Sequence, residues 1–412
     1  MTRPFEPRPA GSAADVEALR AAFFRHVCQT SDQPLGVVVA AARGTTIRDV
    51  AGRDYLDLLA GMGVANVGHA HPAVVAAVTS QAAAYLHVAV YGEMVQAPQA
   101  RLAARLAEVA PGDLSVVYFT NSGAEAVEGA LKTARKCTGR AGIVAFHGAF
   151  HGDTFGALSV GGNAVYRDPF EPLLPGVRFL PFDDESGLEQ IDTSVGAVIV
   201  EPVQGEGGVR IPGAGFLPAL RRRCDAVGAL LIADEVVTGF GRTGALFASD
   251  HWDTVPDILV LAKALGGGMP LGAFIGRPDV MRLLSHDPPL AHVTTFGGHP
   301  VSCAAGLAAL EIVLGDGLAA RAARVGATWV ADLRTALGSA VRDVRGLGML
   351  IGLEFHTPEA TRRFTQRCFD AGLILNWTLH RDCVVRLAPP LTISADEVVA
   401  ATRIMGAAAS EL

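Results

Sequence analysis

The amino-acid sequence predicts an α/β fold in which a large domain with a mostly parallel sheet is joined to a smaller α/β domain. The first observation is a series of short runs that are apolar throughout, namely SVVYFT, GIVAF, GAVIV, ALLIA and ILVLA. Such runs are typical of strands buried on both faces. The second observation is that helical stretches separate the runs, which favours parallel pairing. With 412 residues, 50% of them hydrophobic, the chain can form two or three compact units.

Polar or glycine-rich clusters follow these runs directly. They read NSGAEA, HGAFHGD, EPVQGEGG, DEVVTGFGR and KALGGG. Ligands of parallel sheets bind beyond the carboxyl ends of the strands, where these clusters fall. We therefore expect one site to be built from all of them.

The two ends of the chain differ from its middle. The segment GTTIRDVAGRDYLDLLAG has the turn signals of a hairpin and is expected to pack against the small domain. The stretch AALEIVLGDGLAARAARVGATWVADLRTALG is long and helical by periodicity, and strand-like GMLIGLEF and CVVRLAPPLTI follow it. Ser394 and Glu397 form a capping box that opens the last helix. The predicted units are an N-terminal segment 1–60, a large domain 61–304 and a small domain 305–412.

Composition argues against several classes of partner. The net charge is -7 and both signs are mixed, so the chain lacks the basic stripe that binds nucleic acid or an anionic membrane. Six scattered cysteines without a C-x-x-C pair fit a reducing compartment. No apolar stretch approaches the roughly 18 residues of a membrane span, and the first residues lack the apolar centre of a signal peptide. The sequence therefore predicts a cytoplasmic protein.

The segment DEVVTGFGRTG contains a G-x-G-x-x-G pattern, formed by Gly239, Gly241 and Gly244. A dinucleotide-binding loop needs a helix that starts at the third glycine and faces the pyrophosphate. The residues after Gly244, ALFASDHWDTVPD, are a poor helix because Asp and Pro interrupt them. We interpret the pattern as accidental, and a nicotinamide oxidoreductase is the alternative that would need it.

Asp234 and Lys263 both end apolar runs, and together they indicate a cofactor. Taken alone, Asp234 fits a turn cap as well as a functional carboxylate, and Lys263 fits a surface lysine as well as a nucleophile. A lysine among apolar residues is a plausible amine nucleophile because its ammonium form is disfavoured. A buried carboxylate needs a positive partner, such as a protonated ring nitrogen. A nucleophilic lysine with such a carboxylate is what pyridoxal phosphate requires.

The phosphate of this cofactor needs an anion site, which the segment TNSGAEAVEGALKTARK offers. Ser122, Gly123 and Ala124 lie at the predicted start of an amphipathic helix, where free N–H groups and the helix dipole favour an anion. In HGAFHGD, the spacing of His147 and His151 invites a metal interpretation. The glycines beside them argue against a rigid helix, and no acidic third ligand is obvious. We expect no metal.

These motifs resemble the class III aminotransferases, which are pyridoxal-phosphate enzymes of fold type I. The family includes acetylornithine, ornithine, 4-aminobutyrate and omega-amino-acid aminotransferases. The resemblance extends from DYLDLLAGMGVANVGHAHPAV, through NSGAEAVEGALKTARK, FHGDTFGALS, VEPVQGEGGV, DEVVTGFGRTG, AKALGGGMPLGA and TTFGGHP, to VVRLAPPLTIS. It implies a large domain with a mostly parallel seven-stranded sheet and a small domain that both chain ends form. It also implies a homodimer, or a tetramer of dimers, with active sites at the interface.

The resemblance assigns roles to individual residues. It implies Lys263 as the Schiff-base lysine and Asp234 as the partner of the pyridine nitrogen. It places Phe150 on the cofactor ring with His151 nearby. The phosphate ligands that it implies are Ser122, Gly123 and Thr295, and Thr295 would reach the site of the neighbouring subunit.

The substrate residues also follow from the resemblance. Arg386 matches an arginine that binds the substrate α-carboxylate, a task that suits its bidentate geometry. Glu206 matches a glutamate that pairs with this arginine when the substrate lacks a carboxylate there. An internal ion pair for Arg386 and a surface turn for Glu206 are the alternatives.

Two positions depart from the ornithine and acetylornithine branch. Asp153 stands where the motif FHGRT of that branch carries an arginine for the distal carboxylate of 2-oxoglutarate. Either another residue binds this carboxylate, or the acceptor is different, such as pyruvate. Asp153 could instead attract a distal amino group. Val237 replaces a glutamine near the ring hydroxyl and makes that edge more apolar. Both weaken ornithine and acetylornithine as substrates.

The predicted activity is transfer of an amino group from an amino acid or omega-amino compound to a 2-oxo acid, pyruvate or 2-oxoglutarate. In the predicted mechanism Lys263 moves a proton of the donor while the ring opposite Asp234 accepts electrons. Racemisation or epimerisation of an amino acid on the same scaffold is the alternative that the residues leave open.

Overall fold

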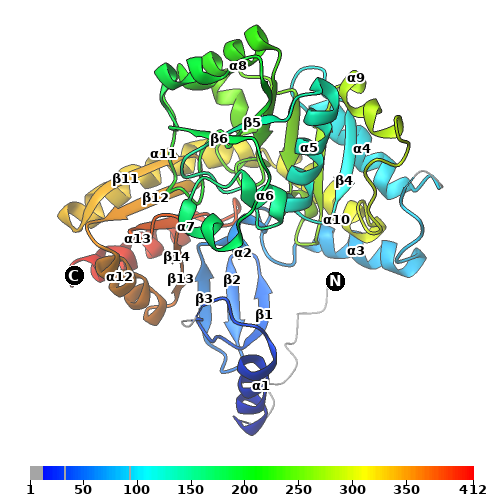
Figure 1. The fold of residues 1–412 in the computed structure, drawn as a ribbon. Helices are drawn as coiled ribbons and strands as arrows, with labels where there is room; N and C mark the ends of the chain where they lie inside the picture. Colours follow the sequence, from blue (N-terminus) through cyan, green and yellow to red (C-terminus); the bar gives the residue numbers. More distant parts are fainter. Residues whose placement is uncertain (1–12, 32–33, 92–93) are drawn as a thin grey trace.

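The computed structural model describes residues 13–31, 34–91 and 94–412 (Figure 1). The residues up to 12, on which the absence of a signal peptide was partly predicted, lie outside the described part. The described chain forms a central seven-stranded sheet and two four-stranded sheets. The blue strands of the N-terminal segment and the orange and red C-terminal elements lie to one side of the central sheet (Figure 1).

The central sheet confirms the predicted fold. Each of the five apolar runs forms one of its strands, and the strands β7, β8 and β9 are buried along their whole length. The strand β10 runs antiparallel to both of its neighbours, while the other adjacent pairs are parallel. In spatial order the strands are β4 (Val116–Thr120), β10 (Gly272–Gly276), β9 (Ile258–Leu261), β8 (Leu230–Asp234), β7 (Val195–Val200), β5 (Gly142–Phe146) and β6 (Val177–Leu180).

Helices cover this sheet. The helix α5 buries the apolar positions that its periodicity predicted, which are Ala126, Val127, Ala130, Leu131 and Ala134. The helices of this part are α3 (Pro72–Ala84), α4 (Ala97–Val109), α5 (Gly123–Thr138), α6 (Phe155–Ser159), α7 (Ala164–Arg167), α8 (Phe216–Val227), α9 (Pro278–Met281) and α10 (Pro300–Gly315). Short 3-10 helices span Asp168–Phe170, Glu185–Gln190, Ala248–Trp252, Lys263–Gly266, Arg282–Ser285 and Gly338–Ala340.

The two chain ends share a sheet. The predicted hairpin forms β2 and β3, which pair antiparallel, and β13 from the C-terminal part extends β3 in parallel. The elements of this sheet are β1 (Val39–Arg43), β2 (Thr46–Asp49), β3 (Asp54–Asp57) and β13 (Leu373–Ile374), preceded by α1 (Ala13–His26). The short α2 (Ala60–Gly63) follows β3.

A third sheet and three helices complete the C-terminal part. Its strands are β11 (Val341–Leu347), β12 (Leu350–Phe355), β15 (Val384–Leu387) and β14 (Asn376–Trp377). Its helices are α11 (Leu318–Leu337), α12 (Pro358–Asp370) and α13 (Ala395–Ala409). The side chains of Ser394 and Glu397 cap α13 reciprocally, which confirms the predicted capping box.

The long helical stretch of the C-terminal third is not continuous, which corrects the sequence-based expectation. It divides into the end of α10 and α11, and the two helices are bent by 62°. Gly317 at the break has a φ of 60°, a left-handed conformation that ends helices and favours glycine. Within the described residues, no single helix is long and apolar enough to span a membrane, and only this bent pair passes on length and hydropathy.

The glycine pattern at 239–244 serves packing. A Cβ atom on Gly241 would lie 3.3 Å from the Ala319 backbone, and one on Gly244 would lie 2.9 Å from the Ala323 Cβ, so both glycines let the loop contact α11. Arg242 fixes the same loop, because its buried guanidinium donates to the Met349 carbonyl oxygen at 3.2 Å. A 3-10 helix, Ala248–Trp252, follows in place of a helix start at Gly244. The loop therefore lacks the geometry of a dinucleotide site.

Candidate active site

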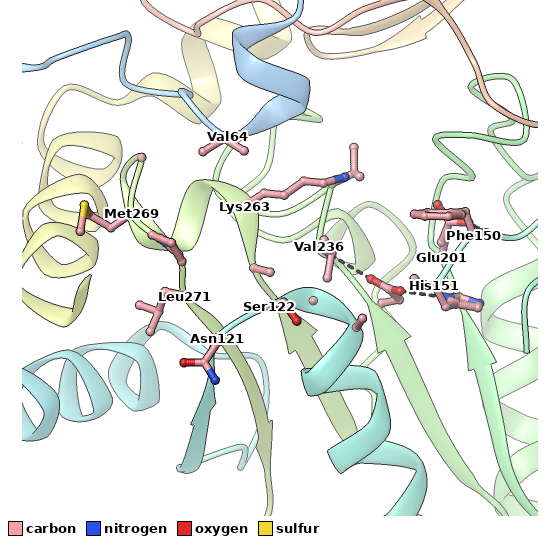
Figure 2. Close-up of a pocket in the computed structure, with 18 residues that line it drawn as sticks. Val64, Asn121, Ser122, Phe150, His151, Glu201, Val236, Lys263, Met269 and Leu271 are labelled. Atoms are coloured by element: carbon pink, nitrogen blue, oxygen red, sulfur yellow. Dashed lines mark hydrogen bonds and ion pairs between the residues drawn. The ribbon is translucent and has the colours of Figure 1, made fainter. Parts of the chain in front are cut away.

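A cavity of about 420 Å3 lies at the carboxyl edge of the central sheet, where the polar clusters were expected to meet. Its walls come from the segments after β4, β5, β7, β8 and β9, together with Val64 from the N-terminal segment (Figure 2). The lining residues are Val64, Asn121, Ser122, Gly123, Ala124, Phe150, His151, Gly152, Glu201, Asp234, Val236, Val237, Ala262, Lys263, Gly268, Met269, Pro270 and Leu271. The central strands thus bring residues far apart in sequence to one place.

Lys263 is the lysine of this cavity. The chain has three lysines, and the other two, Lys132 and Lys136, lie on α5 and donate to the segment 286–292. Figure 2 shows the Lys263 side chain crossing the cavity between Val64 and Ser122. Its φ of 48° is a left-handed value that costs energy for a residue with a Cβ atom. Burial of the amino group, together with repulsion by Arg386, lowers the pKa of Lys263 to about 8, against the opposing effect of Glu206 and Asp234.

The lowered pKa predicts a pH profile for the apoenzyme. The neutral amine attacks carbonyl groups, so the rate of covalent capture of pyridoxal phosphate should rise with pH, with a midpoint of about 8. Arg386→Leu should raise this midpoint because it removes a repelling cation, and Glu206→Gln should lower it because it removes an attracting anion. Stopped-flow absorbance over a pH series measures the midpoint. A value near 10.5, the ordinary lysine pKa, would contradict the prediction.

Asp234 and His151 form a buried pair in the wall of the same cavity. The His151 Nδ1 atom lies 2.7 Å from the Asp234 Oδ2 atom, and the Asp234 Oδ1 atom accepts the Val236 N–H at 3.0 Å. The Asp234 residue is 4% exposed. His151 and Asp234 are 83 positions apart, so the local motifs in which they occur did not predict this contact. The His151 Nε2 atom is buried and has no hydrogen-bond partner among the described residues.

The start of α5 supplies an anion site. Ser122 is the N-cap, and its hydroxyl oxygen accepts the Glu125 N–H at 3.2 Å, which leaves the hydroxyl hydrogen able to donate. The first N–H groups of an α-helix have no partner within the helix, and no described residue accepts those of Gly123 and Ala124. Together with the helix dipole, these donors fit a phosphate group. The helix start therefore has the predicted geometry.

Phe150 and Val237 line other parts of the wall. The ring of Phe150 lies beside His151 and Glu201 in Figure 2. His147, the second histidine of the metal hypothesis, lies instead against the Phe179 ring, with centroids 5.9 Å apart. Across the described ranges, no three His, Cys, Asp or Glu side chains gather in a manner suited to a metal ion.

Glu201 is a lining residue that the sequence analysis missed. It follows β7 directly, is 5% exposed, and lies within the influence of both His151 and Asp234. Burial raises the pKa of Glu201 to about 7, and the Asp234 carboxylate adds to this rise, while His151 opposes it. Glu201 directly follows an apolar run, GAVIV, as Asp234 and Lys263 follow theirs. Testing the residue after every apolar run would therefore have identified Glu201.

Arg386 and Glu206 form an ion pair next to the cavity. The Arg386 Nη1 atom contacts the Glu206 Oε1 atom, and the residues are 2% and 8% exposed. The Glu206 Oε2 atom accepts the Leu379 N–H at 2.8 Å. Burial alone would raise the pKa of Glu206, but the Arg386 guanidinium outweighs it and holds the pKa below its usual value. The pair does not line the cavity itself, although both charges act on Lys263.

Two predicted site residues lie outside the cavity wall in this chain. Asp153 is exposed, next to the lining residue Gly152, and its charge acts on His380, which lies against Phe150. Thr295 is exposed and does not line the cavity. The structure thus brings the other predicted residues to the cavity or directly beside it, and leaves these two at the surface.

Fold and site define a class of protein before any comparison. A lysine with a lowered pKa, a buried carboxylate in the same cavity and a free helix start are the three features that pyridoxal phosphate needs for its aldehyde, ring nitrogen and phosphate. The cavity volume lies in the range that holds cofactors. The residues present therefore fit this cofactor, and the class is a pyridoxal-phosphate enzyme on an α/β scaffold.

Comparison with known proteins gives the family. Residues 27–409 match the family model of class III aminotransferases. An acetylornithine aminotransferase from Methanopyrus kandleri is 46% identical over 365 residues, which are 88% of this chain and 91% of the relative. An ornithine aminotransferase structure from Toxoplasma gondii has a TM-score of 0.89 at 34% identity, covering 96% of this chain and 95% of that one. An (S)-enantioselective omega-transaminase from Thermomicrobium roseum has a TM-score of 0.90 at 31% identity, covering 97% and 99%.

The chain belongs to the class III aminotransferases. It is a transaminase that uses pyridoxal phosphate, as the resemblance of its motifs predicted. The family match and the aminotransferase relative support transamination, and they count against the nicotinamide oxidoreductase.

Proposed function

We propose that this transaminase takes its amino group from a donor that carries an α-carboxylate, with Lys263 as the reacting amine and Arg386 as the carboxylate-binding residue. The observation that carries the proposal is the position of Lys263, which shares one cavity with Asp234 and the start of α5 and lies beside Arg386. Bound pyridoxal phosphate supplies the aldehyde that receives the amino group and a ring that accepts electrons.

Lys263 performs the proton transfer in this proposal. The neutral Nζ atom would remove the proton from the α-carbon of the donor and would deliver it to the carbon that carried the cofactor aldehyde. A pKa of about 8 suits this role, because a general base works best when its pKa lies near the operating pH.

Asp234 and His151 act on the cofactor ring. The Asp234 carboxylate would hold a proton on the ring nitrogen, because a buried carboxylate is stabilised by a cationic partner. His151 holds the Asp234 Oδ2 atom in place, so the carboxylate has one orientation. The N–H groups of Gly123 and Ala124 and the Ser122 hydroxyl would bind the phosphate.

Arg386 and Glu206 form a site in which Glu206 gives up its contact with Arg386 when a donor carboxylate binds. In the structure Glu206 occupies the guanidinium, so an incoming carboxylate would replace one anion with another. An amine without a carboxylate would leave the pair intact. Similarity to an acetylornithine and an ornithine aminotransferase supports donors that carry this carboxylate.

Asp153 determines the preference for the oxo-acid acceptor. No cation pairs with this exposed carboxylate among the described residues, and its charge would repel a distal carboxylate on the acceptor. We therefore propose an acceptor without a distal carboxylate, such as pyruvate, in preference to 2-oxoglutarate. The same charge would favour a distal amino group on a donor.

Exchanging Asp153 for arginine tests this preference. Asp153→Arg should raise kcat/KM for 2-oxoglutarate by roughly 10-fold, because a charge-assisted contact replaces a repulsion. Pyruvate, which has no distal carboxylate, should keep its kcat/KM in the same variant. Asp153→Asn is the matched control and should give a smaller gain, since it removes the repulsion without adding a cation. An unchanged kcat/KM for 2-oxoglutarate in both variants would contradict the assigned role.

Assembly and location belong to the same proposal. We propose a homodimer, or a tetramer of dimers, in which Thr295 reaches the neighbouring site. Exposed apolar side chains on both sides of Thr295 support an interface there, since Val293 is 57% and Phe296 is 53% exposed. Light scattering of the purified enzyme tests this, and a monomer would contradict it. A cytoplasmic location accords with six free cysteine thiols.

The visible absorption spectrum of the holoenzyme tests the function directly. Adding L-alanine, L-glutamate or L-ornithine without an oxo acid should remove the absorption band of the bound cofactor with at least one donor. A simple diamine provides the comparison without an α-carboxylate and should act more slowly. A band that persists with every amino acid would contradict the proposed donor class.

A further inference from the structure

The carboxylate of Glu201 joins two loops that the proposed function uses for different tasks. Its Oε1 atom accepts the Phe150 N–H at 2.9 Å, and its Oε2 atom accepts the Gly205 N–H at 3.0 Å. Phe150 belongs to the loop after β5, while Gly205 belongs to the loop after β7. Since β5 and β7 are neighbours in the sheet, one side chain at the end of β7 reaches both loops.

Each of these bonds ends next to a residue of the site. Phe150 is followed by His151, which contacts Asp234. Gly205 is followed by Glu206, which contacts Arg386. The first bond therefore fixes the wall beside the cofactor ring, and the second fixes the turn that carries the anion opposite Arg386.

We propose that Glu201 is a positioning residue that couples cofactor binding to recognition of the donor carboxylate. It does so by fixing the positions of the Phe150 loop and the Glu206 loop relative to each other. This inference rests on the proposed roles of Phe150 and Glu206. A carboxylate suits the task because both of its oxygens accept and neither donates. A glutamine in the same place would turn an N–H2 group toward one of the two backbone N–H groups.

The loops have a second connection, so the loss of Glu201 should leave the fold intact. The Gln204 Nε2 atom donates to the His147 carbonyl oxygen at 3.0 Å. A Cβ atom on Gly207 would lie 2.7 Å from the Gly148 carbonyl oxygen, so the two loops also pack closely. The other residues would then keep the two loops in contact, and Glu201 would determine their exact relative position.

Glu235 provides a matched control. It is a buried glutamate at 1% exposure on the same edge of the sheet, directly after β8, and it does not line the cavity. Its carboxylate accepts the N–H groups of Ala248 and Ser249 at 2.5 and 2.9 Å, so it holds a segment outside the site. Glu235→Gln therefore reproduces the loss of a buried acceptor without touching the two loops.

The test compares Glu201→Gln and Glu235→Gln in two measurements. The first is the Kd for pyridoxal phosphate, from titration of the apoenzyme. The second is the ratio of kcat/KM for L-alanine to kcat/KM for a primary amine without a carboxylate, such as 1-phenylethylamine. We expect Glu201→Gln to weaken cofactor binding and to raise this ratio, each by about 10-fold, because a displaced Glu206 competes less with the donor carboxylate for Arg386. Glu235→Gln should change neither at a comparable loss of Tm.

The outcomes separate the inference from the function on which it rests. A Kd and a ratio that both stay unchanged in Glu201→Gln would overturn the proposal, and a change in only one would overturn the coupling. Equal effects of Glu235→Gln would reduce the role of Glu201 to stability alone. If Glu201→Gln fails to fold, Glu201→Asp keeps the charge but is too short for both bonds, and it should show the same two changes. If the unaltered enzyme does not react with L-alanine or any other amino acid, the proposed function fails instead.

Discussion

Replacement of Lys263 by alanine should lower kcat by about 10⁴-fold, because it removes the side chain that we propose as both the reacting amine and the general base. No other lysine can substitute. Lys132 and Lys136 lie on α5, where they donate to the segment 286–292. Single-turnover absorbance with an amino donor measures the loss, and the Tm of the variant shows whether the fold persists.

Chemical fixation gives an independent check on Lys263. Borohydride reduction of the unaltered holoenzyme, followed by peptide mass spectrometry, should find the cofactor on Lys263 and leave Lys132 and Lys136 unmodified. Lys136→Ala is the control substitution and should retain normal turnover. Normal activity in Lys263→Ala, or fixation of the cofactor on another lysine, would refute the assignment.

The second large effect is expected from Arg386→Leu. This change removes the proposed charge-assisted, bidentate partner of the donor carboxylate, so KM for amino acids should rise by about 10- to 100-fold. KM for amines without a carboxylate should change less, because such donors carry no group that Arg386 would bind. Steady-state kinetics with both donor types measures the difference. A similar rise in KM for both would show that Arg386 has a structural role only.

Stability has to be separated from binding in this variant. Glu206 would become a buried carboxylate without its cation, which costs about 3–5 kcal/mol of folding free energy. The double variant Arg386→Leu with Glu206→Leu removes both charges and should recover most of that stability in denaturant titrations. Its KM for amino acids should remain high, since the carboxylate partner is still missing.

Much of the architecture could be predicted from the sequence because the strands are buried on both faces. Uninterrupted apolar runs predicted β4, β5, β7, β8 and β9 within about one residue, and periodicity predicted the buried face of α5. The strand β10 was not among them. Its segment GAFIG is short, has glycine at both ends and follows a glycine-rich loop. Its sequence therefore does not distinguish a strand from a continuation of that loop. Its antiparallel direction depends on its two neighbours.

The sequence pattern also predicted one long helix where the structure has two, α10 and α11. Periodicity continues from α10 into α11, but the chain bends at Gly317, whose left-handed φ of 60° interrupts the helix. The glycines of the 239–244 loop had a local match to a dinucleotide motif. Their role became clear only from Ala319 and Ala323, which approach that loop from α11.

The sequence by itself determined which chemical groups the site contains. Lys263, Asp234 and the N-cap residue Ser122 stand at the ends of apolar runs or at the start of an amphipathic helix, and such positions are readable because burial and periodicity are local patterns. The sheet then dictates that strand ends meet at one edge, which is why these residues share a cavity.

Only the tertiary structure decided how those groups interact. The contacts of His151 with Asp234, of Arg386 with Glu206 and of Glu201 with two loops join residues from different strand ends, and no periodicity in the sequence records such pairing. The lowered pKa of Lys263 likewise depends on burial and on Arg386, which lies 123 positions further along the chain. Charge interactions act through space, so the chemistry of the site follows from the fold even where the residues themselves are evident in the sequence.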